Sequence, residues 1–252
     1  MLLPYFNQAG GLSAIVDGWL RTLNKLEHDF ELILIDDGST DGSREIADGF
    51  AARNARVRMY RHEHREGFGG ALRTGLAVVQ HPLVAYTACD YPYQPTELNK
   101  LLSAIDLAHI AVGCRTDAVP AVMRRFGAFY RGVVRVLFGI SLEPRPGWYG
   151  WRAWWRSIGD RWIYGLRVHD VQCAFKLFRK SALDRISIQS NGSFVHAEIL
   201  AKANFLGHLI AEASIGRMGG NFRGAVEPAL PSEAADRRRV FRAPAFVGEP
   251  QA

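Results

Sequence analysis

An apolar run that ends abruptly in acidic and small polar residues constrains this chain more than any other feature. Residues 30–43 read Phe-Glu-Leu-Ile-Leu-Ile-Asp-Asp-Gly-Ser-Thr-Asp-Gly-Ser. The run from Leu32 to Ile35 predicts a buried parallel strand, and the residues from Ser43 to about Arg53 predict a helix. Ligands of open α/β sheets bind outside the carboxyl ends of the strands, which is where this polar stretch falls.

Two carboxylates, Asp36 and Asp37, stand at that strand end. They can accept hydrogen bonds from the N–H and hydroxyl groups of a base or a ribose. The alternative is that the polar residues only cap the next helix, since Ser39, Thr40 and Asp41 are all good N-cap residues. A cap does not explain two aspartates directly after a strand, so we favour the ligand interpretation.

Strands and helices alternate along most of the chain, which predicts an α/β fold with a mostly parallel sheet flanked by helices. Periodicity and turn signals place the elements. The expected strands are 2–6, 30–35, 56–61, 83–89, 108–114, an apolar segment within 168–179, and 209–215, and the expected helices are 12–26, 43–53, one from about 67, one from 96, one from 181 and one from 194.

Glycines gather at the start of one expected helix, at Gly67, Gly69, Gly70 and Gly75. They allow a close approach of the backbone either to a phosphate or to the sheet, and the sequence leaves both readings open. Their spacing does not match the dinucleotide fingerprint, which argues against a dinucleotide oxidoreductase. A further carboxylate, Asp90, follows the strand 83–89 and is again in the ligand position.

The composition is that of a globular protein of 252 residues with a net charge of +6. No apolar run is long enough for a transmembrane helix, and the N-terminus lacks the pattern of a secretory signal. The three cysteines have no metal-binding spacing, so we expect buried free thiols in a reducing cytoplasm. Nucleic-acid binding has only the positive charge in its favour, because no known module is visible.

The positive charge is concentrated in one segment, 120–168, which holds nine arginines and two acidic residues. Within it, the stretch 123–162 contains two amphipathic helical patterns with aromatic residues on one face and arginines elsewhere. Such a pattern is typical of a helix at a membrane interface. The alternative is that both helices pack on their own domain or on a second subunit.

We expect one domain over residues 1–227, with 120–168 as an amphipathic insert. The tail 228–252 has no periodicity and is rich in Pro, Arg and Ala. We therefore expect it to be disordered.

Six motifs, taken in order, resemble glycosyltransferase family 2, whose members have the GT-A fold and use nucleotide-sugar donors. The nearest likeness is to the polyprenyl-phosphate sugar transferases. The resemblance covers residues 2 to about 215, and its motifs are 4–8 (PYFNQ), 35–43 (IDDGSTDGS), 67–75 (GFGGALRTG), 90–98, 112–115 (VGCR) and 170–178 (DVQCAFKLF).

This resemblance implies a role for each matching residue. Asp90 is expected to hold Mg²⁺ or Mn²⁺ at the donor diphosphate and to be catalytic, and Asp170 is the candidate general base. The nucleotide-sugar site is expected to comprise Pro4, Tyr5, Asn7, Asp36, Asp37, Ser39, Gly67, Gly69, Arg73 and Asp90. The acceptor or its phosphate is expected to contact Arg115, Arg124, Arg131, Gln172 and Lys176.

The chain also departs from the family pattern. Ala88 stands where the first Asp of the metal-binding DXD motif is usual, and Pro92, Arg65, Ala174 and His196 are further departures. One hypothesis is an inverting hexosyltransferase that acts on a polyprenyl-phosphate or glycan acceptor, in the cytoplasm or at the inner face of the membrane. The other is a catalytically impaired protein that binds nucleotide sugars or docks on membranes and has kept the fold.

Overall fold

The computed structural model describes residues 1–26, 28–89, 93–115, 168, 170–216 and 233–247. The insert 120–168, apart from Val168, lies outside these ranges, and so do both amphipathic patterns of 123–162. Within the described ranges, no helix combines the length and the apolar character that a membrane crossing requires.

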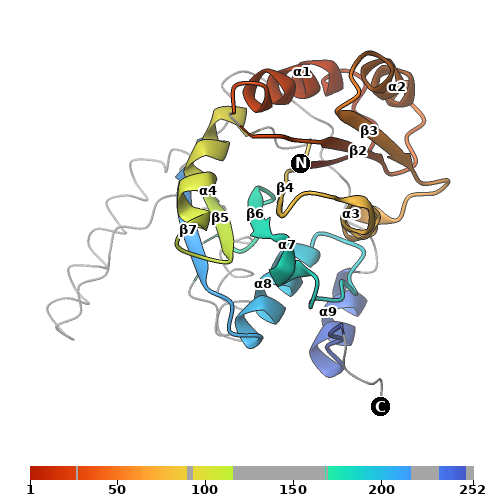
Figure 1. The fold of residues 1–252 in the computed structure, drawn as a ribbon. Coiled ribbons are helices and arrows are strands. Elements are labelled where there is room, and N and C mark those ends of the chain that lie inside the picture. Colours follow the sequence, from red (N-terminus) through yellow and green to blue (C-terminus); the bar gives the residue numbers. More distant parts are fainter. Residues whose placement is uncertain (27, 90–92, 116–167, 169, 217–232, 248–252) are drawn as a thin grey trace, which may run out of the picture.

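A sheet of seven strands, in the order β3-β2-β1-β4-β6-β5-β7, forms the centre of the structure (Figure 1). The α/β architecture with a mostly parallel sheet is confirmed, and β6 is antiparallel to both of its neighbours, β4 and β5. The strands are β1 (Leu2–Tyr5), β2 (Leu32–Asp36), β3 (Val57–Arg61), β4 (Leu83–Tyr86), β5 (Ile110–Arg115), β6 (Lys176–Arg179) and β7 (Ile210–Ile215).

Helices cover both faces of this sheet. Figure 1 shows α1 and α2 on one face, and α3 and α8 on the other. The helices are α1 (Leu12–Leu23), α2 (Ser43–Arg53), α3 (Gly67–Val78), α4 (Leu98–Ile105), α7 (Lys180–Leu183), α8 (Val195–Phe205) and α9 (Glu233–Arg242), with a short 3₁₀ turn, η1 (Pro95–Glu97), before α4.

Apolar side chains between these layers form the core. The strands β1 and β2 are buried along their whole length, and their side chains before Asp36 are mainly apolar on both faces, as expected for parallel strands between helices. Trp19 of α1 packs edge-on against Phe175, with ring centroids 5.4 Å apart. The register pairs Leu3 with Leu34 and Tyr5 with Asp36, which aligns the carboxyl ends of β1 and β2.

The C-terminal segment differs from the sequence-based expectation. Residues 233–242 form helix α9, Val240 is buried, and Ile186 pairs with Phe246 in an isolated bridge. The prediction of disorder from residue 228 is therefore wrong for 233–247. The low apolar content of the tail hid this result, because a few specific contacts hold the segment in place.

Candidate active site

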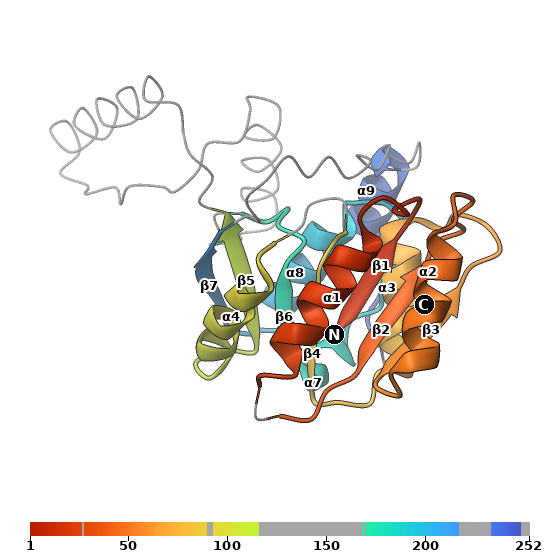
Figure 2. The same ribbon diagram turned by 90° about the horizontal axis from the view of Figure 1, so that it is seen from above.

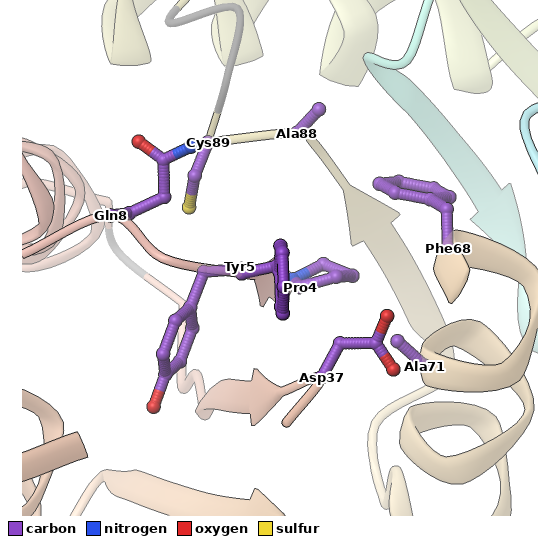
Figure 3. Close-up of a pocket in the computed structure, with 9 residues that line it drawn as sticks. Pro4, Tyr5, Gln8, Asp37, Phe68, Ala71, Ala88 and Cys89 are labelled. Atoms are coloured by element: carbon purple, nitrogen blue, oxygen red, sulfur yellow. The ribbon is translucent and has the colours of Figure 1, made fainter. Parts of the chain in front are cut away.

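A pocket that is open to solvent lies at the carboxyl ends of β1, β2 and β4 (Figure 3). This is the place where open α/β sheets bind ligands. Pro4, Tyr5 and Asp37, which the family resemblance assigns to the nucleotide sugar, line it. The full lining is Pro4, Tyr5, Phe6, Gln8, Asp37, Phe68, Ala71, Ala88 and Cys89.

Asp37 joins the end of β2 to the start of α3. Its Oδ1 accepts hydrogen bonds from the backbone N–H of Glu66 and its Oδ2 from that of Gly67, both at 2.8 Å. Its Oδ1 also lies 2.9 Å from Nδ1 of His62, whose Nε2 lies 2.8 Å from Oγ1 of Thr74. The carboxylate is directed toward α3, next to Ala71 (Figure 3). Asp37 thus satisfies N–H groups at the start of α3 and forms part of the pocket wall.

Asp36 lies outside the pocket wall and is fully buried. Its Oδ1 accepts a hydrogen bond from the backbone N–H of Ser39 at 2.8 Å, and Arg44 approaches its Oδ2 at 3.3 Å. Ser39 in turn accepts from the backbone N–H of Asn7 at 3.0 Å, and Asn7 accepts from that of Thr40 at 2.9 Å. Asp36, Ser39 and Asn7 therefore fasten two loops together beside the pocket.

The capping alternative holds only in part. The N-cap residue of helix α2 is Gly42, which has no side chain to cap the helix. Asp41 accepts from the backbone N–H of Ser43 at 3.1 Å and from that of Ala9 at 2.9 Å. Asp41 therefore supports the start of α2, whereas Asp36 and Asp37 serve other contacts.

The glycines of α3 are required for different structural reasons. Gly67 has φ +84°, a left-handed conformation that favours glycine. A Cβ on Gly69 would lie 1.9 Å from the carbonyl oxygen of Ser190, so this glycine allows close packing against a loop. A Cβ on Gly75 would meet Leu2 of the sheet at 3.0 Å. For Gly69 and Gly75 the packing interpretation therefore applies.

Arg73 was expected on the base and sugar side of the donor. In the structure it donates to the carbonyl oxygen of Ser190 at 3.0 Å and to Oδ1 of Asn191 at 2.6 Å. It is not part of the pocket lining, because its guanidinium is turned toward that loop.

A second polar group forms at the end of β5, where Arg115 binds Asp170. Nε and Nη2 of Arg115 donate to the two carboxylate oxygens at 2.6 and 2.9 Å. Both side chains are largely buried. Burial lowers the pKa of Arg115 and the Asp170 carboxylate raises it, and the net change is upward. Arg115 therefore remains a cation, held in a fixed orientation by a bidentate ion pair.

Lys176 was expected near the acceptor, but it is fully buried. Its Nζ donates to the carbonyl oxygens of Val171, at 3.1 Å, and of Cys173. Burial lowers the pKa of Lys176 to about 8. Lys176 thus holds the turn that follows Asp170, and Gln172 lies half-buried on that turn.

His196 is a packing residue. Its Nδ1 lies 3.1 Å from the hydroxyl of Tyr86, and its ring packs against Phe68 with centroids 4.8 Å apart. Burial lowers the pKa of His196 well below its usual value, so the ring is neutral. Because Phe68 lines the pocket, His196 supports the pocket wall from behind.

Three predicted site residues, Asp90, Arg124 and Arg131, lie outside the described residues. In the described part of the chain, no group of three His, Cys, Asp or Glu side chains is placed to hold a metal ion. Ala88 contributes only a methyl group to the pocket. The described residues therefore do not by themselves provide a metal site.

Sequence reasoning missed several pocket residues. Phe68, Ala71 and Gln8 line the pocket, and His62 orients Asp37. The family motifs 4–8 and 67–75 contain Gln8, Phe68 and Ala71, and these motifs were the available signal. Nothing in the local sequence pointed to His62, which meets Asp37 only through the pairing of β2 with β3.

Comparison with known proteins agrees with this geometry. The sequence profile described as Glycosyl transferase family 2 matches residues 2–187. The chain belongs to this family. Among solved structures, glucosyl-3-phosphoglycerate synthase from Mycobacterium tuberculosis, in complex with Mn²⁺ and UDP-glucose, matches with a TM-score of 0.59 over 95% of this chain and 74% of that one. At 19% identity, this likeness shows the fold.

Curated relatives of this family 2 chain are 23–28% identical to it. Undecaprenyl-phosphate mannosyltransferase from Micrococcus luteus is 25% identical over 221 residues, which are 85% of this chain and 81% of that protein. Glycosyltransferase AglD from Haloferax volcanii is 28% identical over 223 residues, 84% of this chain. The chain spans only 32% of the length of AglD and 49% of dodecaprenyl-phosphate galacturonate synthase from Rhizobium johnstonii, to which it is 23% identical over 75% of its own length.

Proposed function

We propose that this protein transfers a hexose, with inversion, from a nucleotide-sugar donor to a polyprenyl-phosphate or glycan acceptor. The observation that carries the proposal is the pocket at the carboxyl ends of β1, β2 and β4, walled by residues of the family motifs. Family membership and relatives named for polyprenyl-phosphate sugar transfer support it.

The donor nucleotide occupies this pocket. Pro4, Phe68 and Ala71 give it apolar walls that suit a planar base, and Asp37 gives it a carboxylate. Asp37 already accepts three short contacts, and a carboxylate offers about four lone-pair sites. One lone-pair direction of the Asp37 carboxylate therefore remains to accept a hydrogen bond from a ribose hydroxyl. The loops at the rim of the pocket are shaped by contacts of Asn7, Asp36 and Ser39. Tyr5, at the end of β1, lines the pocket.

The acceptor site is built around Arg115. A phosphate acceptor is already anionic, so it needs fixed cations more than it needs a base. Arg115, oriented by Asp170, is such a cation, and Arg124 and Arg131 are the further cations of this proposal. Gln172 lies on the turn that Lys176 holds, next in the chain to Asp170 and Val171.

Asp170 has two candidate roles, and one substitution separates them. As a general base it would take the proton of a hydroxyl acceptor, whereas as a positioning residue it would orient Arg115. Asp170→Asn keeps an oxygen for Arg115 but is not basic. Activity that survives in Asp170→Asn with a hydroxyl acceptor supports the positioning role. A loss of 10²-fold or more in kcat, with unchanged donor affinity, supports the base.

A divalent cation, Mg²⁺ or Mn²⁺, is part of the proposal for the donor diphosphate. Asp90 is the carboxylate that the family motif assigns to it, and such cations supply charge neutralisation of the leaving diphosphate when bound. Loss of nucleotide affinity on removal of the cation, reproduced by Asp90→Ala, supports this assignment. Equal nucleotide affinity with and without the cation contradicts this assignment. Arginine side chains would then neutralise the charge of the diphosphate.

Peripheral contact with the inner face of the membrane through 123–162 belongs to the same proposal, because a polyprenyl-phosphate acceptor resides in a bilayer. Co-sedimentation of the protein with anionic vesicles tests this contact. Deletion of the segment would abolish sedimentation if the segment makes the contact.

Calorimetric titration with UDP-glucose, GDP-mannose, UDP and GDP, each with and without Mn²⁺, tests the donor site. Asp37→Ala is the site variant, and Asp17→Ala, at an exposed aspartate on α1, is the matched control. Binding of one nucleotide, weakened by Asp37→Ala alone in folded protein, supports the proposal. Failure of every nucleotide to bind the wild type overturns it.

A second candidate function, nucleotide-sugar binding without transfer, has one observation in its favour: Ala88 places a methyl group in the pocket where the family pattern has a carboxylate. A transfer assay that uses undecaprenyl phosphate and a labelled donor decides between them. Donor binding without any labelled lipid or released sugar would favour the second.

A further inference from the structure

The loop of residues 189–192 is held by side chains from three helices. Glu198 of α8 accepts from the backbone N–H groups of Gln189 and Ser190, both at 2.8 Å. Arg73 of α3 donates to the carbonyl oxygen of Ser190 at 3.0 Å. Asp236 of α9 accepts from the backbone N–H of Asn191 at 2.9 Å. Side chains of three helices thus meet on a single short loop.

Asn191 is the junction of these contacts. Its N–H donates to Asp236, its side-chain oxygen accepts from Arg73 at 2.6 Å, and its carbonyl oxygen accepts from the backbone N–H of Gly69 at 2.8 Å. Every one of these three groups is engaged by a different part of α3 or α9. A shift of Asn191 therefore has to move the first turn of α3.

That first turn of α3 is also a wall of the donor pocket. Phe68 and Ala71 line the pocket, and the N–H groups of Glu66 and Gly67 are bound by Asp37. The turn is consequently fixed from two sides. Asp37 holds it at the pocket, and Asn191 holds it from the loop 189–192.

Helix α9 is well anchored on this loop. Asp236 is only 3% exposed, and Arg239 donates to its Oδ1 at 2.8 Å. Beyond the helix, Gln189 donates to the carbonyl oxygen of Ala243 at 3.0 Å and accepts from the N–H of Ala245 at 2.8 Å. Figures 1 and 2 show α9 on the same side of the sheet as α3 and α8. The family profile ends at residue 187, so both the loop and α9 lie beyond it.

We infer that α9 is a positioning element of the donor pocket, and that Asp236 acts through Asn191 to set the first turn of α3. The inference rests on the proposed function only in taking the ligand to be a nucleotide. A charge-assisted bond to a buried N–H is stronger than a neutral one, which makes Asp236 the decisive contact of α9.

Hydrogen exchange on the full chain tests the coupling without a ligand. Asp236→Ala should speed the exchange of amides 66–72 about tenfold, since Gly69 loses its fixed acceptor. Arg238→Ala, an exposed position on the same helix, should leave those amides unchanged. Asp236→Asn, which keeps an oxygen acceptor, should restore most of the protection. Faster exchange at 189–192 with wild-type exchange at 66–72 would overturn the inference.

Calorimetry with UDP and GDP provides the second readout. Asp236→Ala should weaken the wild-type nucleotide affinity about tenfold, and Arg238→Ala should not change it. If Asp236→Ala does not fold, Asn191→Ala replaces it, because that change removes only the acceptor of Arg73 and should loosen the same amides. A wild type that binds neither nucleotide contradicts the proposed function, and the exchange result still decides the coupling.

Discussion

Replacement of Gly69 by alanine gives the sharpest test of the packing around α3. An added Cβ would lie 1.9 Å from the carbonyl oxygen of Ser190 and 2.8 Å from its carbonyl carbon. Real Cβ atoms essentially never approach closer than 3.0 Å. The obstacle is backbone rather than the tip of a flexible side chain. Either the loop at Ser190 or the first turn of α3 must therefore move away.

The expected cost combines three contributions. Overpacking of this kind costs about 1–3 kcal/mol. Separation of the loop also weakens the Gly69–Asn191 hydrogen bond, about 1 kcal/mol, and the charged bonds of Arg73, about 1.5–3 kcal/mol. Alanine offsets about 0.5–1 kcal/mol of this cost, because it is more favourable than glycine in a helix. We expect Gly69→Ala to lower the free energy of unfolding by about 2.5–6.5 kcal/mol, a large part of the ~5–15 kcal/mol typical of a domain.

Urea denaturation of Gly69→Ala and Gly49→Ala measures this difference. Gly49 is also helical, in α2, and its Cβ would meet only Arg53 at an ordinary 3.7 Å. Gly49→Ala should therefore stabilise the protein by about 0.5–1 kcal/mol. The two substitutions are chemically identical and are expected to have opposite signs. Equal stability of Gly69→Ala and the wild type would refute the close approach of α3 to the loop at Ser190.

Three further predictions concern buried charges. Glu198→Ala should cost about 3–5 kcal/mol of stability in urea denaturation, because it leaves the buried Lys202, 2.6 Å from Glu198, without its carboxylate. The double variant with Lys202→Met should lose less than the two single changes added together, and strict additivity would contradict the pairing. Lys176 has a folded-state pKa of about 8, below its ordinary value of 10.5, because of burial. The unfolded state therefore holds more protons between these values, and the stability of the wild type relative to Lys176→Met should rise by about 1 kcal/mol per pH unit from pH 8 to 10, whereas a flat difference would count against the burial.

The alternation of strands and helices was predictable because each buried strand is a short apolar run that ends in polar residues. The same feature placed a ligand site at the carboxyl end of β2, and the pocket at Asp37 lies there. The antiparallel insertion of β6 between β4 and β5 was not predictable from local pattern, because it depends on how the chain returns after residues 116–167.

Side-chain partners were harder to predict than elements. Arg73 and Gly69 belong to a glycine-rich motif that suits either a phosphate or close packing, and only the position of Ser190, far along the chain, selects packing. Helix α9 was missed for a related reason. Its docking depends on Asp236 and Val240, two residues in a segment whose average composition is polar.

The structure also changes the terms of the choice between a ligand site and a helix cap. Asp37 accepts N–H groups at the start of α3 and lines the pocket with the same carboxylate. Asp37 thus combines a ligand-site position with a helix-start contact, although at α3 and not at α2, the helix of the capping alternative. The contact that fixes Gly67 also fixes Phe68, the following residue, in the pocket wall. A variant of Asp37 should then lose nucleotide affinity partly through Phe68. Phe68→Ala leaves the hydrogen bonds of Asp37 in place. The loss of nucleotide affinity in this variant therefore measures the contribution of the Phe68 wall apart from that of the Asp37 carboxylate.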